Sequence, residues 1–356
     1  MRGSPRKPLV SGTLTLVLSA CLSLWPGGTV AAQHTSSKDE KPLLQAYAAG
    51  IFSAEPSSTE GALTLLLPIG ARGIGMGRAV TASSGAESVF WNPAGLARAE
   101  GGSFFIFRGN HLAGEATGFS VLLGRQPLGA LGISYQLLDL GDQDLRDGEG
   151  NYLGSVSFRD HLAVVSFGLQ VLPRLDTGIN FKIFQSRITC RGQCTDAGVT
   201  GTAYALDAGV LGEPFATIPL RVGVLIAHLG PNLQLINVEQ ADPLPTRLRA
   251  AVSYEALRHF TDMPGVELWV TAEVEDRWRD LGDPILYLGG EFTAGEEDLF
   301  FIRAGYGQQQ SGQSAGASVG LGLRYEQFDL SVAKRVSGSS LTGESEPVHI
   351  AFGVMF

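Results

Sequence analysis

The feature that most constrains this chain is the alternation of apolar with small or polar residues through its second half. In 218–227, 317–325 and 348–356, every second residue is apolar, and most residues between them are Gly, Ser, Ala, Arg or His. Successive side chains of a β-strand point to opposite faces. The pattern therefore predicts strands with one apolar face and one small or polar face.

Several further features favour a barrel in a membrane over a water-soluble sandwich, which also alternates. No run of 18 or more apolar residues follows residue 32, so no second transmembrane helix is expected. Closed barrels cross bilayers with short alternating strands, apolar outside and polar inside. The chain also ends within such a segment on Phe356, which resembles the assembly signal of bacterial outer-membrane proteins. We therefore predict an all-β fold, a transmembrane antiparallel β-barrel.

The alternation divides residues 102–356 into fourteen expected strands, an even number as bacterial outer-membrane barrels require. The expected strands are 102–109, 115–125, 128–139, 155–171, 175–187, 202–211, 218–227, 246–257, 266–276, 284–294, 298–308, 315–325, 327–336 and 346–356.

Short connections alternate with long ones, and the four longest are polar or Gly-rich: 140–154, 188–201, 228–245 and 337–345. Because these barrels have short periplasmic turns and long external loops, both ends of the barrel are expected in the periplasm. Cys190 and Cys194 then fall in an external loop. In an exported protein this spacing predicts a small disulfide loop, and a metal site would need more ligands.

The first 32 residues read as a signal peptide, with Arg2, Arg6 and Lys7 before an apolar stretch and small residues up to Ala32. The alternative is a lipoprotein signal that ends at Cys21, which would be lipidated. Cleavage at Ala32 takes the formal net charge from −9 to −12, so nucleic acid is not an expected partner. We expect export to the outer membrane of a Gram-negative cell, with its lipid bilayer as a partner.

Residues 33–101 lack the strand pattern and predict a compact N-terminal plug or hatch segment in the lumen or at its periplasmic mouth. Within it, Asn92 is expected to cap a helix whose first residue is Pro93. The segment contains G-A-R-G-I-G-M-G-R-A at 70–79 and N-P-A-G-L-A at 92–97. The residues of these two elements that we take as a family motif are Gly70, Arg72, Gly73, Gly75, Met76, Gly77, Asn92, Pro93, Ala94 and Gly95.

Together these elements resemble the PorV/PorQ family, within the wider superfamily of FadL-like (FadL/TodX) outer-membrane proteins. The stretches 205–209, 244–249 and 302–306 support the resemblance. The chain departs from that family at 82–87, Ala-Ser-Ser-Gly-Ala-Glu, where acidic residues are usual. The glycines at 73, 75 and 77 do not have the G-x-G-x-x-G spacing of a dinucleotide loop. We read them as a tight turn that packs closely against the barrel wall.

The parity of the strands directs many charged residues to the lumen, where they are expected to pair with each other and with the plug. A site for an anionic head group is the alternative. These residues are Lys182, Arg221, Arg247, Arg249, Arg303, Arg324, Arg335, Asp207, Glu267, Glu273, Glu291 and Asp329.

The sequence does not predict an enzyme, a cofactor or a metal site. The six His residues are scattered, and no serine lies in a G-x-S-x-G setting. The PorV/PorQ resemblance implies a component of type IX-like protein secretion that works with secretion-machinery proteins at the cell surface. The alternative, implied by the FadL branch, is passive uptake of long-chain fatty acids or other hydrophobic small molecules. A structural barrel without transport is a third reading.

Overall fold

The computed structural model describes residues 60–111, 114–193, 198–234, 241–258, 263–308, 316–336 and 348–356, all within the compact unit that begins at Leu44. The predicted signal peptide, the lipidation site Cys21 and residues 33–59 lie outside the described residues. No helix in this part of the chain is long and apolar enough to span a membrane.

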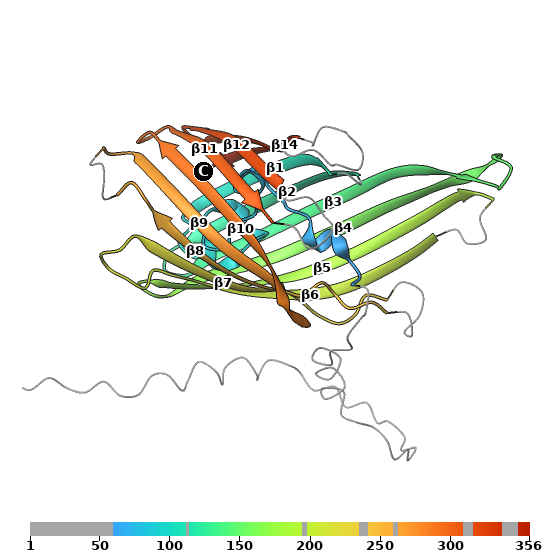
Figure 1. Ribbon diagram of the computed structural model, residues 1–356, viewed down its shortest axis with the longest axis horizontal. Coiled ribbons are helices and arrows are strands. Elements are labelled where there is room, and N and C mark those ends of the chain that lie inside the picture. The colour runs from blue at the N-terminus through green and yellow to red at the C-terminus, as the bar shows by residue number, and fades with distance from the viewer. Residues whose placement is uncertain are drawn as a thin grey trace, which may run out of the picture. The chain divides into compact units, whose positions relative to one another are not determined.

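Fourteen antiparallel strands close into one barrel in which each strand pairs with its sequence neighbours and β1 pairs with β14 (Figure 1). The predicted fold is confirmed. The strands are β1 Gly101–His111, β2 Gly114–Arg125, β3 Gly129–Arg146, β4 Tyr152–Leu172, β5 Leu175–Gly192, β6 Gly198–Gly212, β7 Leu220–Leu229, β8 Arg247–Glu255, β9 Val266–Arg277, β10 Asp280–Ala294, β11 Leu299–Gly307, β12 Gly316–Tyr325, β13 Phe328–Arg335 and β14 Val348–Met355.

The wall has the two environments that the alternation predicts. Val319 and Ile350 are 48% and 47% exposed on the outer face, whereas their neighbours Ser318 and Ala351 are buried on the inner face. The outward apolar residues recur on every strand, as a bilayer requires and a soluble protein avoids.

Two predicted external loops are wrong, because most of their residues extend the strands. Residues 140–146 belong to β3, and 188–192, including Cys190, belong to β5. Strands β3 to β6 therefore run past the ends of β7 to β14 (Figure 1). These hairpin tips are polar, so they lack the alternation that a bilayer imposes. Cys190 is disulfide-bonded, and Cys194 lies outside the described residues, as does the predicted loop 337–345.

We call the end of the barrel with these two hairpins the hairpin end. We call the opposite end the turn end, where the short connections, Gly101 and Phe356 lie. Residues 60–100, the inner segment, contain four short helices: η1 Leu63–Leu66, α2 Ala71–Gly75, η2 Ala86–Val89 and η3 Pro93–Leu96. The predicted cap is confirmed, since the Asn92 side chain accepts from the Ala94 N–H and Pro93 begins the helix.

Candidate functional site in the barrel lumen

The inner segment runs through the lumen from the hairpin end to the turn end. At the hairpin end, Glu60 makes a two-pronged ion pair with Arg247, at 2.7 and 2.6 Å, where β8 begins. At the turn end, Arg98 Nε lies 2.8 Å from the carboxylate of Asp176, near the start of β5. The segment is thus tied to the wall at both ends of the lumen.

Inward-facing glycines let the wall approach the backbone of the inner segment. A Cβ added at Gly305 would lie 2.1 Å from the Gly77 nitrogen, and one at Gly178 would lie 2.3 Å from the Pro93 carbonyl carbon. Nine strands contribute such a glycine, each leaving no more than 3.2 Å for a Cβ: Gly124, Gly132, Gly168, Gly178, Gly209, Gly223, Gly289, Gly305 and Gly320. At these strands the inner segment packs directly against the wall.

The motif glycines serve the same close packing. Gly77 has a φ of 61° where the chain leaves α2, and it faces Gly305. A Cβ at Gly73 would lie 2.4 Å from the Trp91 ring, and one at Gly75 would lie 3.2 Å from the Cα of Gly320. The predicted close packing against the wall is what the structure contains.

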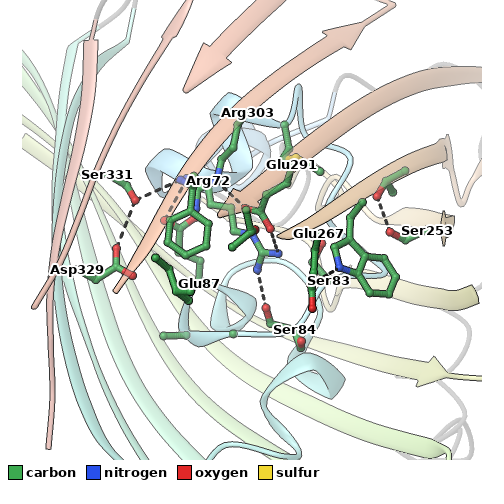
Figure 2. A pocket seen from close by; sticks show the side chains of 18 of the residues that line it. Arg72, Ser83, Ser84, Glu87, Ser253, Glu267, Glu291, Arg303, Asp329 and Ser331 are labelled. Carbon is green, nitrogen blue, oxygen red and sulfur yellow. Dashed lines mark hydrogen bonds and ion pairs between the residues drawn. The ribbon is translucent and has the colours of Figure 1, made fainter. Parts of the chain in front are cut away.

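Arg72 of the motif anchors α2 to β10 and β11. Its guanidinium donates two hydrogen bonds to Glu291, at 2.9 and 2.7 Å. Arg303 Nε donates to the same carboxylate at 2.6 Å. Figure 2 shows the three side chains converging. Charge-assisted bonds with this bidentate geometry are among the strongest that side chains make.

Glu87 secures the start of α2 by accepting from the backbone N–H groups of Arg72 and Gly73, both at 3.2 Å. Burial raises the pKa of this carboxyl, while Arg303 and the two backbone donors act in the opposite direction. Gly70 has a φ of 88°, and a Cβ there would lie 2.2 Å from a Glu87 oxygen.

A buried ionic network holds the middle of the inner segment against β8 and β9. Glu273 accepts from the Thr81 N–H at 2.8 Å and from its hydroxyl at 2.7 Å. Arg249 lies 2.7 Å from Glu273 and 3.1 Å from Glu275. It also donates to the Arg78 carbonyl at 3.1 Å. Removing one partner would leave a charge buried without compensation.

A polar cavity of about 370 Å³ lies between the inner segment and strands β8 to β13 (Figure 2). Arg221 extends into it with its guanidinium 4.0 Å from the centre of the Trp269 ring. A second cavity, of about 830 Å³, opens at the turn end and shares Ser84 to Ala86 in its lining. The turn-end half of the lumen therefore contains cavities lined by charged residues.

The hairpin-end half of the lumen contains an apolar region that lies among buried ion pairs. A buried cluster joins η1 to the wall and to the connection 230–246 between β7 and β8. We call it the apolar cluster, and its members include Leu65, Ile69, Phe107, Leu162, Val164, Phe184, Ala203, Ala205, Leu233 and Leu244. A cavity of about 30 Å³ beside it is lined by apolar side chains such as Leu65 and Leu225, and also by the charged residues Arg78, Arg247, Arg249 and Glu275.

The wall beside the apolar cluster is interrupted between β6 and β7. The two strands pair from Gly212 up to Leu206, with a register shift at Asp207. There, His228 has a φ of 60° and donates its backbone N–H to the Asp207 carboxylate at 2.9 Å. Beyond this point, 198–205 of β6 has no strand partner on this side among the described residues. We call this interruption the seam.

The structure brings eleven of the twelve predicted lumen residues into three groups, and Arg335, the last residue of β13, lies outside them. Arg247, Arg249 and Glu273 join the ionic network around Thr81. Arg221, Arg303, Arg324, Glu267, Glu291 and Asp329 line the polar cavity. Lys182 pairs with Asp207 at 2.6 Å beside the seam. Most of them pair with one another or with the inner segment, whereas Glu267 accepts a hydrogen bond from Trp269 and Arg221 pairs with Glu213.

Several residues of the site were not among those predicted, including Glu60, Thr81, Glu87, Trp91, Arg98, Asp176 and Glu275. Glu275 has the same strand parity as Glu273, so the alternation could have indicated it. Trp91 donates its ring N–H to the Ile69 carbonyl at 2.9 Å, a contact for which the sequence has no signal. Within the described residues, no group of His, Cys, Asp and Glu has the geometry of a metal site.

No family model matches this chain, and no curated protein matches it. Among solved structures it is similar to the CymD monoaromatic hydrocarbon channel, with a TM-score of 0.56 and 14% identity over 84% of this chain and 99% of that one. It is also similar to the P. putida toluene transporter TodX, with a TM-score of 0.52 and 11% identity over 81% and 98%. It is similar as well to a TodX deltaS2S3 mutant, with a TM-score of 0.55 and 12% identity over 81% of this chain and 99% of that one.

At these identities the likeness concerns the fold. It confirms the expected barrel fold, and membership of the wider FadL-like superfamily stays a prediction. Membership of the PorV/PorQ branch stays a prediction.

Proposed function

We propose that this protein is an outer-membrane channel that takes up small hydrophobic molecules passively and releases them sideways into the bilayer through the seam. The hairpin end then faces the outside and the turn end faces the periplasm. This is the alternative that the sequence left open, and the hydrocarbon channels similar in fold favour it over a role in secretion. The secretion role implied by the PorV/PorQ resemblance stays a prediction.

The division of the lumen is the observation that carries this proposal. A hydrophobic molecule gains free energy within the apolar cluster and loses it among the charged residues of the turn-end half. The inner segment also fills the direct path to the periplasm. The seam lies beside the apolar cluster and offers an exit that avoids the polar half.

The cavity beside the apolar cluster, about 30 Å³, is smaller than a hydrocarbon. Passage therefore requires movement of the apolar side chains that close the seam. Leu233 and Leu244 are the natural candidates, because they belong to the irregular connection between β7 and β8 rather than to a strand ladder.

A disulfide across the seam tests this route. Leu206 and Leu229 are the last paired residues of β6 and β7, and partners in an antiparallel ladder lie within disulfide reach. We expect Leu206→Cys with Leu229→Cys, once oxidised, to lower toluene uptake by cells at least tenfold, and a reductant to restore it. Uptake would be measured against cells without the protein.

The matched control is Val210→Cys with Val224→Cys, a pair in the same ladder where β6 and β7 are already continuous. It carries the same native disulfide at Cys190, so it also controls for the reductant. We expect uptake in this variant to match the wild type. Unchanged uptake in the oxidised seam variant would contradict the lateral route.

A further inference from the structure

We propose that the apolar cluster admits uncharged hydrophobic molecules and excludes molecules with a carboxylate head group, such as fatty acids. This inference rests on the proposed function and names its substrate class. It follows from the charges around the apolar cluster, because a carboxylate that leaves water needs a cation that is free to receive it.

The cations nearest the apolar cluster already have carboxylate partners. Arg249 lies between Glu273 and Glu275, at 2.7 and 3.1 Å. Arg78, which lines the small cavity, lies 3.7 Å from Glu275 and donates to the Leu66 carbonyl. The charge of each guanidinium is therefore already balanced by a carboxylate of the chain.

Two further cations near the apolar cluster, Arg247 and Lys182, also have carboxylate partners. Arg247 is held by Glu60 through two bonds, at 2.7 and 2.6 Å. Lys182, beside the seam, lies 2.6 Å from Asp207, and both side chains are buried. An arriving carboxylate would have to displace a chain carboxylate that is already desolvated and positioned.

One further carboxylate makes the surroundings less favourable to an anion. Asp160 of β4 accepts a hydrogen bond from the Thr64 hydroxyl of η1, next to Leu65 of the apolar cluster. No cation pairs with Asp160 within the described residues. Arg279, in the turn between β9 and β10 toward the hairpin end, neither belongs to the apolar cluster nor lines its cavity.

An alcohol and a carboxylate with the same alkyl chain separate this charge effect from hydrophobicity. Vesicles containing the protein would be offered labelled 1-dodecanol or dodecanoate at pH 8, where dodecanoate is ionised. Protein-dependent uptake is the rate above that of vesicles without protein. We expect dodecanol uptake to exceed dodecanoate uptake at least tenfold.

Removing the carboxylate partner of one of these cations should then admit dodecanoate. Glu275→Gln leaves Arg78 without its carboxylate partner and Arg249 with one partner fewer, so we expect the tenfold preference for the alcohol to shrink to threefold or less. Glu60→Gln, near the entrance and less deeply buried, should act in the same direction because it frees Arg247. This substitution provides a second variant if Glu275→Gln does not fold. Glu149→Gln, in the exposed tip between β3 and β4, makes the same charge change and should keep the preference.

Each outcome has a distinct meaning. Equal uptake of alcohol and acid by the wild type would overturn the exclusion of carboxylates and leave the uptake function standing. A preference that is unchanged in both folded lumen variants would overturn the charge argument. Uptake of neither compound above empty vesicles would overturn the proposed function, and this inference with it.

Discussion

Replacing Gly305 with alanine is expected to unseat the inner segment from the barrel wall. The added Cβ would lie 2.1 Å from the Gly77 nitrogen and 2.2 Å from the Met76 carbonyl carbon. Both are backbone atoms that cannot rotate away, so the two backbones must separate. We expect a loss of about 3 kcal/mol in the free energy of unfolding, the upper part of the range for overpacked cores. Urea unfolding followed by gel mobility without boiling would measure it.

Gly290→Ala is the matched control for this substitution. Gly290 lies in neighbouring β10, and the nearest atoms to an added Cβ are 3.9 and 4.0 Å away. Both variants place alanine in a strand, so any change in strand propensity is shared. We expect the control to unfold within about 0.5 kcal/mol of the wild type. Equal midpoints for the two variants would show that Gly305 does not contact the inner segment.

Replacing Arg249 with methionine is expected to have an effect of similar or larger size. The substitution leaves Glu273 and Glu275 buried with fewer positive neighbours, and Glu273 is also the anchor of Thr81. Loss of one partner of a buried ion pair costs about 3–5 kcal/mol. Adding Glu273→Gln removes one of the buried carboxylates left without its partner. The double variant should therefore recover part of the lost free energy of unfolding in the same measurement.

Arg108→Met provides the comparison at the surface. Arg108 lies 2.7 Å from Glu115, but both side chains are exposed to solvent. Pairs of this kind contribute about 0–1 kcal/mol. If Arg108→Met and Arg249→Met cost the same, or if Glu273→Gln deepens the loss, then the network around Thr81 does not hold the inner segment as described.

The alternation was enough to predict the barrel because every side chain of a single-layer wall faces either the bilayer or the lumen. Residues 317–325 and 348–356 show this directly, since their apolar residues face outward in the structure. The same reasoning failed at 140–146 and 188–192. There both faces of the hairpins meet water or the hairpin end of the lumen, so no alternation is imposed, while backbone pairing still extends the strands.

The alternation of inward and outward positions along the strands predicted which charged residues face the lumen. It could not predict which of them form ion pairs. Arg72 and Glu291 are 219 residues apart, and their contact depends on how the inner segment crosses the barrel. The two halves of the lumen were not predictable for the same reason. The apolar half depends on where Leu65, Leu233 and Leu244 meet, and none of these residues belongs to a strand.

The permeability of the lumen to a small sugar tests most directly whether the inner segment closes it. Liposomes containing the protein would be diluted into an isotonic solution of arabinose, and swelling would be followed by light scattering. Because the glycine contacts and ion pairs hold the inner segment across the lumen, we expect no swelling above that of empty liposomes. We expect Gly305→Ala, if it inserts, to swell and so to confirm that the assay detects an open lumen. Swelling that rises with the amount of wild-type protein would contradict a closed lumen, and with it the sideways route.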